Sequence, residues 1–212
     1  MTKIQLYSSY QDTGFCPANV SRVVFLDTEV LSTNYDGVDK VRECLRKGQG
    51  PELIRELSDL HQVDYAKFRE NVAPILYYCW DPKTINALKN VLDTTGAKIV
   101  LSSDLRFAFS QSDMADLFKI HGLAEYYVDN IGQVIDDNET TKFFTNKYGI
   151  DVCHWRTWEI LEYLERCPQI KSYVVLDEMY LNPGLGDRFF RDFTSYQKDM
   201  IAKIIQLLQT DM

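Results

Sequence analysis

Residues 23–27, Val-Val-Phe-Leu-Asp, constrain the fold of this chain more than any other stretch. The four apolar residues, three of them β-branched or aromatic, predict a buried strand. Asp27 follows directly, and a second carboxylate, Glu29, comes two residues later. In open α/β sheets, ligands bind at the edge formed by the carboxyl ends of the strands. We therefore expect Asp27 to lie at such an edge and to be the centre of a functional site.

Two later apolar runs, residues 97–101 and 173–176, also end in polar side chains. In a parallel sheet the carboxyl ends of the strands lie at one edge, so we expect these polar side chains close to Asp27. The polar side chains that follow the two runs are Ser102, Ser103, Asp177 and Glu178.

Helical periodicity occupies most of the intervals between these strands. Strands that alternate with helices predict an α/β fold: a mostly parallel sheet with right-handed crossovers and helices on both faces. We also expect short strands at residues 4–7 and 126–128, and a polar loop over 129–141. The predicted helices cover residues 84–95, 115–121, 156–166 and 195–209.

Residues 32–80 form an insert between the first strand and the next helix. Apolar residues at helical spacing predict several helices in it. An aromatic run, Tyr77-Tyr78-Cys79-Trp80, ends the insert. This run either packs in the core or belongs to a small cap beside the catalytic edge. We expect a single domain over residues 1–212 that contains this insert.

Composition limits the classes of function. The net charge of −8 disfavours a general nucleic-acid binder, which is normally basic. No apolar run is long enough to span a membrane. The five cysteines are odd in number and none are spaced C-x-x-C, so we expect reduced thiols, with no disulfide and no structural zinc site.

Carboxylates that converge at one edge repel each other unless a cation lies between them. Arg156, at the start of a predicted helix, is one candidate for a protein cation, and Lys147 is the alternative. Carboxylate oxygens also suit Mg²⁺, which usually binds one or two carboxylates together with water and substrate phosphate. The predicted carboxylates therefore suit a Mg²⁺ site at this edge.

With these motifs in this order, the chain resembles the haloacid dehalogenase (HAD) superfamily of aspartate-nucleophile phosphatases. The resemblance covers roughly residues 20–209 and implies a Rossmann-like core. The stretch from residue 97 to Arg106 looks like a branch whose second strand ends Ser-Ser-x-x-Arg, which includes domains found near RNA-repair enzymes. The matching pieces are residues 23–29, 98–103, Arg156 and 174–178.

The resemblance implies a role for each matching residue. Asp27 would attack phosphorus and form an aspartyl-phosphate, and Glu29 would act as general acid and then base. Ser102 would hydrogen-bond a phosphoryl oxygen, and Arg156 would stabilise the transferring group by its charge. Ser103 and Arg106 either contact the substrate or serve as a helix cap and a surface charge. The magnesium ligands would be Asp27, the carbonyl of Glu29, Asp177 and Glu178.

Three positions depart from the usual family pattern. Glu29 and Glu178 stand where Asp is common, and Arg156 stands where Lys is usual. Each change keeps the charge, but arginine cannot deprotonate and forms a planar fork. A relative that has lost catalysis and only binds its ligand is therefore an alternative to an enzyme.

These expectations describe a Mg²⁺-dependent phosphomonoester phosphatase. The acidic net charge and the aromatic-rich insert favour a phosphoprotein substrate. Some members of the superfamily, including bacterial effectors, act on phosphotyrosine, so phosphotyrosine is one expectation. A polynucleotide-end phosphatase is the alternative. The expected location is the cytoplasm, or the host-cell cytosol for a secreted effector.

Overall fold

The computed structural model describes residues 10–11, 16–32, 35–69, 71–134, 138–149, 155–194 and 197–211. Its centre is a five-stranded sheet in the order β4-β3-β2-β6-β7, in which every neighbouring pair is parallel. This confirms the predicted α/β class with a Rossmann-like core. The strands are β2 (Arg22–Leu26), β3 (Lys98–Leu101), β4 (Tyr127–Asn130), β6 (Ser172–Leu176) and β7 (Phe189–Phe190).

The central strand β2 aligns the ends of its two neighbours. Leu26 lies opposite Leu101 of β3 and opposite Leu176 of β6. The hydrogen bonds continue one residue further, because the Asp27 amide donates to the Leu176 carbonyl at 2.9 Å and the Ser102 amide donates to the Leu26 carbonyl at 2.9 Å. The three motif strands therefore end at one level.

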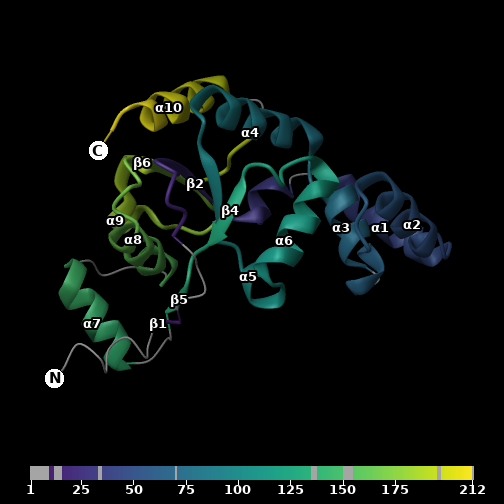
Figure 1. The fold of residues 1–212 in the computed structure, drawn as a ribbon, viewed down its shortest axis with the longest axis horizontal. Coiled ribbons are helices and arrows are strands. Elements are labelled where there is room, and N and C mark those ends of the chain that lie inside the picture. The colour runs from purple at the N-terminus through teal and green to yellow at the C-terminus, as the bar shows by residue number, and fades with distance from the viewer. Residues whose placement is uncertain are drawn as a thin grey trace.

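Alternation along β2 divides the core into two layers. Val24 and Leu26 pack in one cluster, whereas Val23 and Phe25 pack in another. Helices α4 (Pro82–Thr95) and α10 (Lys198–Gln209) supply the first cluster, and α8 (Arg156–Arg166) and α9 (Asn182–Leu185) supply the second. Figure 1 shows these two pairs on opposite sides of the sheet. Side chains that alternate in direction along a strand explain the separation.

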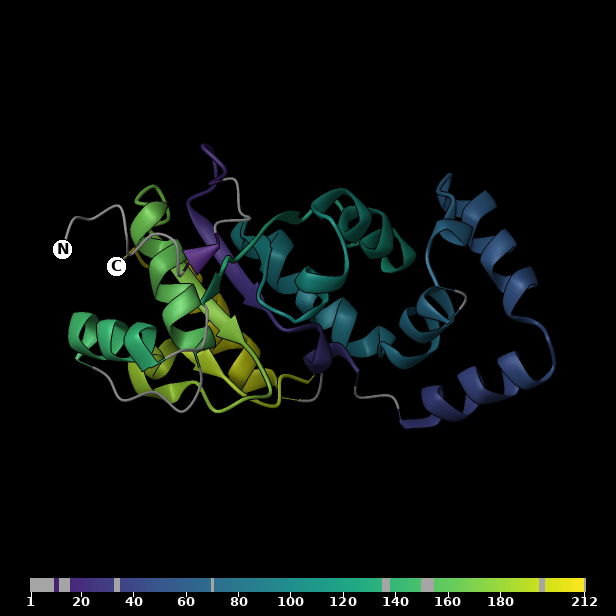
Figure 2. The same ribbon diagram turned by 90° about the horizontal axis from the view of Figure 1, so that it is seen from below.

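The insert is helical, as its sequence predicted, and extends to one side of the sheet (Figures 1 and 2). A short 3-10 helix in the insert is fixed to α6 (Gln111–Phe118), because the hydroxyl of its first residue, Tyr65, donates to the Asp116 carbonyl at 3.0 Å. Trp80 is 2% exposed and packs against Phe118 and His121, so this end of the aromatic run belongs to the core. The elements of the insert are α1 (Tyr35–Arg46), α2 (Gly50–His61), the short 3-10 helix Tyr65–Lys67 and α3 (Val72–Cys79).

The predicted loop over 129–141 is wrong. β4 continues to Asn130, β5 (Gln133–Val134) follows, and α7 (Asn138–Tyr148) begins soon after. β5 pairs antiparallel with β1 (Tyr10–Gln11). Polar residues gave this stretch its loop-like pattern, yet Asp129 is buried and accepts a hydrogen bond from the Tyr163 hydroxyl at 2.8 Å. The strand expected at residues 4–7 lies outside the described residues.

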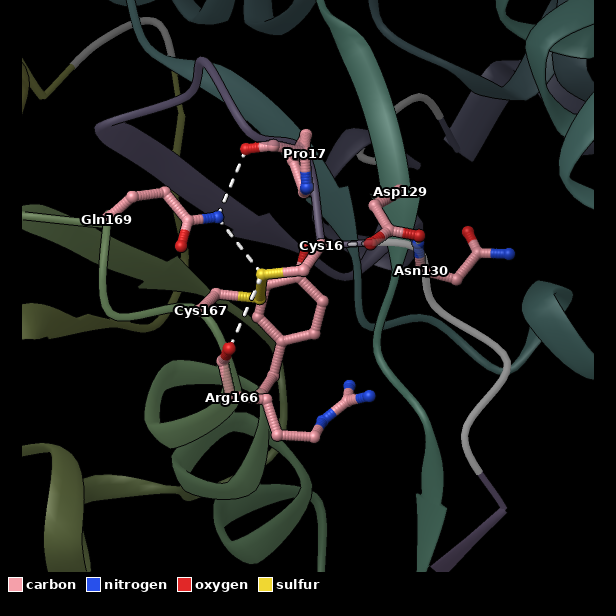
Figure 3. The surroundings of a disulfide bond; sticks show 8 residues. Cys16, Pro17, Asp129, Asn130, Arg166, Cys167 and Gln169 are labelled. Atoms are coloured by element: carbon pink, nitrogen blue, oxygen red, sulfur yellow. Dashed lines mark hydrogen bonds between the residues drawn. A yellow bond between two sulfur atoms is a disulfide. The ribbon is translucent and has the colours of Figure 1, made fainter.

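The expectation that no cysteine forms a disulfide is also wrong. Cys16 and Cys167 are bonded, with their Cα atoms 5.7 Å apart (Figure 3). They precede β2 and β6, whose parallel pairing brings the two strand starts together. Gln169 donates from its side-chain nitrogen to the Pro17 carbonyl at 3.1 Å and so holds the same corner. The cytoplasmic location stays a prediction, but reduced thiols no longer support it, because disulfides are typical of oxidising compartments.

Among the described helices, none combines the length and the apolar character that a membrane crossing requires.

The remaining described elements near the sheet edge are short. α5 (Leu105–Ala108) follows the Ser102 motif and leads into α6. In Figure 1, α5 lies below the sheet and α6 runs from it toward the insert.

Candidate active site

Three side chains from three strand ends meet at the carboxyl edge of the sheet. Asp27 follows β2, Ser102 follows β3 and Asp177 follows β6. All three are buried, with exposed fractions of 3%, 0% and 0%. A buried carboxylate is costly unless a partner compensates its charge. The neighbourhood of Asp27 and Asp177 must therefore supply a cation.

Arg156 supplies that cation from the first turn of α8. Its Nη1 lies 2.6 Å from Asp27 Oδ2 and 2.9 Å from Asp177 Oδ2. Its Nη2 lies 2.7 Å from the exposed Asp104 carboxylate. Burial would lower the pKa of Arg156, but the charges of Asp177 and Asp27 outweigh burial and raise it. The guanidinium therefore stays charged and joins the two carboxylates.

The other oxygens of the two carboxylates accept backbone hydrogen bonds. The Glu29 amide donates to Asp27 Oδ1 at 3.2 Å, and the Met179 amide donates to Asp177 Oδ1 at 2.9 Å. These bonds fix the orientation of both carboxylates at the strand ends. Burial raises the pKa of Asp177 to about 6, although Arg156 and the Met179 amide act in the opposite direction. Asp177 is thus a carboxylate whose charge depends on its cation.

Ser102 and Ser103 have different surroundings despite being adjacent. The Ser102 hydroxyl is buried and has no hydrogen-bond partner among the described residues. The Ser103 hydroxyl lies 2.9 Å from the Thr28 hydroxyl and accepts a bond from the Leu105 amide at 3.4 Å. A buried polar group without a partner costs about 1–3 kcal/mol, so Ser102 is suited to a ligand oxygen. Ser103 instead links the two loops that follow β2 and β3, and its substrate and capping roles stay predictions.

Glu29 and Glu178 are both exposed at this edge. Burial raises the pKa of Glu29 above its ordinary value, and the charges of Asp27 and Glu178 raise it further. A carboxyl group with a raised pKa retains its proton nearer to neutral pH, as a general acid must. The charge of Glu178 acts on Glu29, so the two exposed carboxylates lie near each other at the carboxyl edge of the sheet.

Arg106 and Glu159 form a buried ion pair beside these residues. The Arg106 side chain is 1% exposed and that of Glu159 is 0% exposed, with Arg106 Nη2 2.7 Å from Glu159 Oε2. The alternative of a surface charge for Arg106 is therefore wrong. A substrate contact by Arg106 stays a prediction. Glu159 was missed, because a glutamate in an amphipathic helix gives no signal of burial.

Lys147 is not brought to the site. It lies on α7 and forms ion pairs with Glu162 and Glu165 of α8. Of the two candidate cations, the structure thus places Arg156 next to Asp27. Two further residues that sequence reasoning missed, Thr28 and Asp104, contact Ser103 and Arg156 respectively. Thr28 follows Asp27 and Asp104 follows Ser103, so proximity to a motif was the available signal.

The carboxylates were tested for their fit to Mg²⁺. The described residues contain no group of three or more His, Cys, Asp or Glu side chains arranged to hold a metal ion. However, the Oδ2 atoms of Asp27 and Asp177 both accept a hydrogen bond from Arg156 Nη1, so two hard oxygen donors lie close together and a metal would share them with this guanidinium. Mg²⁺ commonly takes one or two carboxylates and completes its shell with water and phosphate. The donor chemistry fits Mg²⁺.

A cavity of about 400 Å³ lies between the insert and α5. Its walls are mainly apolar, and Arg69 and Asn71 add polar groups. Leu105, which is part of the wall, comes two residues after Ser103. The other lining residues are Val72, Ile75, Leu76, Ala108 and Phe109.

A sequence profile described as the HAD domain in Swiss Army Knife RNA repair proteins matches residues 23–198. No curated protein and no solved structure matched the chain. The matched range begins at the strand that leads to Asp27 and includes every site residue described above.

Proposed function

We propose that this chain, which belongs to the family of HAD domains in Swiss Army Knife RNA repair proteins, is a phosphomonoester phosphatase. Asp27 is the proposed nucleophile. The observation that carries this proposal is the contact of Arg156 with both Asp27 and Asp177 at the carboxyl edge of the sheet. A carboxylate beside a fixed cation suits attack on a phosphoryl group, because the cation stabilises the charge of the transferring oxygens.

In this proposal the reaction has two steps. An Asp27 oxygen forms a bond to phosphorus while the bond to the leaving oxygen breaks, and Glu29 gives that oxygen its proton. Glu29, now ionised, removes a proton from water, which attacks phosphorus and releases Asp27 and inorganic phosphate. The Ser102 hydroxyl donates to a phosphoryl oxygen in both steps, and Arg156 stabilises the negative charge.

Asp27, Asp177 and the Glu29 carbonyl would hold Mg²⁺, with Glu178 contacting it directly or through water. When bound, the ion supplies positive charge that neutralises the phosphoryl oxygens. Arg156 already neutralises part of the carboxylate charge. The charge of the site is therefore shared between a protein cation and the proposed metal.

The surroundings favour a large substrate over a small metabolite. Phe107, Trp155 and Tyr180 are exposed by 51%, 39% and 52%, and each lies within three residues of a site residue in the sequence. Exposed rings beside a phosphate site can stack on the bases of a single strand. The contact of the insert with α6 supports an arrangement in which the insert does not close over the edge.

The family description moves our preference to the phosphorylated end of a polynucleotide, ahead of the phosphoprotein that the composition favoured. The net charge of −8 is the observation that keeps a phosphoprotein, including phosphotyrosine, as the second candidate. In either case we propose that part of the leaving group occupies the cavity lined by Leu105 and Ala108.

Turnover of p-nitrophenyl phosphate, with Mg²⁺ and with excess chelator, tests the enzyme and its metal requirement. A protein that binds phosphate but does not turn over p-nitrophenyl phosphate would be a binding module that has lost catalysis. Comparison of kcat/KM for 3′- and 5′-phosphorylated oligoribonucleotides and a phosphotyrosine peptide then tests the substrate class. A preference of roughly tenfold or more for the peptide, about 1.4 kcal/mol of transition-state binding, would reject the polynucleotide. Ala108→Trp should lower kcat/KM for the preferred large substrate and spare p-nitrophenyl phosphate.

A further inference from the structure

The buried pair Arg106–Glu159 connects two motifs of the proposed site. Arg106 lies four residues after Ser102, and its Nη1 donates to the Ser102 carbonyl. Glu159 lies three residues after Arg156, on the same face of α8. Arg106 Nη2 donates to Glu159 Oε2 at 2.7 Å. The Arg106–Glu159 ion pair thus connects Ser102 to α8, the helix that carries Arg156.

Two further contacts complete this network. Glu159 Oε1 accepts a hydrogen bond from the Val134 amide at 2.9 Å, so both carboxylate oxygens are used. Asp104 Oδ1 lies 2.7 Å from Arg156 Nη2 and 3.5 Å from Arg106 Nη1, and therefore bridges the two guanidinium groups. The contacts of Glu159 with Arg106 and Val134 and of Asp104 with Arg156, at 2.7–2.9 Å, are charge-assisted hydrogen bonds, which are stronger than neutral ones, and the 3.5 Å contact of Asp104 with Arg106 is longer.

We propose that Arg106 and Glu159 are positioning residues that hold Ser102 and Arg156 in register around Asp27. In this proposal neither side chain contacts the phosphate, so the positioning role takes the place of the substrate contact that the sequence predicted for Arg106. The pair instead sets the separation between α5 and the first turn of α8, and through it the distance from the Ser102 hydroxyl to the Arg156 guanidinium. The activity part of this inference rests on the proposed phosphatase function.

Stability alone does not account for a charged pair at this place. Replacing both members of a buried ion pair by apolar residues is often neutral or stabilising, whereas removing one member leaves an uncompensated charge. The planar fork of arginine, however, fixes the direction of two contacts at once, which an apolar side chain or lysine cannot do. Arg106 uses its fork for the Ser102 carbonyl and for Glu159.

The test separates positioning from stability with three variants. Arg106→Met should lower Tm, and the double variant Arg106→Met with Glu159→Met should recover most of that loss. Arg106→Lys keeps the charge and should retain Tm. Positioning predicts that the double variant and Arg106→Lys nevertheless bind inorganic phosphate roughly tenfold more weakly and turn over p-nitrophenyl phosphate about 100-fold more slowly, because small displacements at a reacting centre have such effects.

Lys147→Met is the matched control, because it removes ion pairs on the same helix, at Glu162 and Glu165. It should leave the phosphate Kd and kcat unchanged. Wild-type phosphate affinity and kcat in Arg106→Lys, and in the double variant if it folds, would overturn the positioning role. If wild-type protein binds phosphate but has no turnover, the proposed function fails, and weaker phosphate binding in Arg106→Lys still supports positioning. Protein that binds no phosphate at all would overturn both.

Discussion

Removal of the Arg156 guanidinium should destabilise the fold strongly. In Arg156→Met, the methionine occupies a similar volume but leaves two buried carboxylates without their shared cation. These carboxylates belong to Asp27 and Asp177, which are 3% and 0% exposed and lie 2.6 and 2.9 Å from the same nitrogen. Loss of one partner from a buried pair costs about 3–5 kcal/mol. For a chain of this size, this corresponds to a fall in Tm of roughly 6–20 °C.

The loss should depend on pH in a definite direction. The pKa of Asp177, about 6, is above its ordinary 3.8, so its contribution to stability is fully present below pH 3.8 and is lost as the pH rises through about 6. Arg156 lowers this pKa, and its removal should raise the pKa further. The deficit of Arg156→Met should therefore be largest near about pH 8 and smaller near about pH 5.

Urea unfolding of wild type, Arg156→Met and Arg156→Lys at both pH values measures these differences. Arg156→Lys retains the charge and should recover most of the stability. Lys147→Met is the control, since it removes partly exposed ion pairs of the same helix and should cost about 1 kcal/mol or less. An Arg156→Met protein within about 1 kcal/mol of wild type near neutral pH would refute the view that this guanidinium compensates the carboxylates.

Three other changes have defined outcomes. Glu29→Gln should permit phosphorylation of the enzyme by p-nitrophenyl phosphate but slow the hydrolysis of the phosphoenzyme, and rapid-quench kinetics showing wild-type hydrolysis would exclude Glu29 as the base. Ca²⁺ in excess should inhibit Mg²⁺-supported turnover, since it takes more oxygen ligands and can engage both oxygens of a carboxylate; undiminished turnover under Ca²⁺ would contradict this. Burial lowers the pKa of His121, so the unfolded chain binds more protons near this histidine's ordinary pKa of about 6.5. The contribution of His121 to stability should thus be lost as the pH drops below about 6.5, opposite in sign to that of Asp177, and His121→Gln should remove it; an unchanged pH dependence of thermal unfolding in this variant would be evidence against the contribution.

The parts of the fold that the sequence predicted well are those in which a periodic pattern coincides with a buried face. The four apolar residues before Asp27 became β2, and the helix predicted over residues 156–166 has the bounds Arg156–Arg166. Residues 173–176 became β6, which begins one residue earlier. β2 and β6 are buried almost along their whole length and read as apolar runs, whereas α8 buries one face, so in each case burial and the apolar pattern carry the same information.

The parts that could not be predicted depend on contacts between distant residues. Cys16 and Cys167 are 151 residues apart, and only the parallel pairing of β2 with β6 brings them together. Glu159 looks like an exposed helix residue until Arg106, 53 residues earlier, is placed against it. The helix α7 was missed because its polar beginning resembles a loop. The disulfide and the burial of Glu159 depend on pairings between distant segments, which local sequence does not show.

For the candidate site, the sequence placed the motif residues on the correct edge but not their partners. Asp27, Ser102 and Asp177 could be grouped because parallel strands end together. The bridging geometry of Arg156 and the unpartnered hydroxyl of Ser102 required side-chain positions. The roles of Glu29 and Glu178 remain predictions that kinetics must test.

Covalent trapping of a phosphoenzyme tests the central claim most directly. Wild-type protein mixed with p-nitrophenyl phosphate and Mg²⁺ should be quenched in acid, digested and examined by mass spectrometry. We predict a hydroxylamine-labile phosphoryl group on the peptide that contains Asp27, and its absence in Asp27→Asn. The asparagine is nearly isosteric and Asp177 still pairs with Arg156, so this variant should keep its fold, which circular dichroism checks. Turnover without any phosphopeptide, or a phosphoryl group on another residue that persists in Asp27→Asn, would contradict the assignment of Asp27 as the nucleophile.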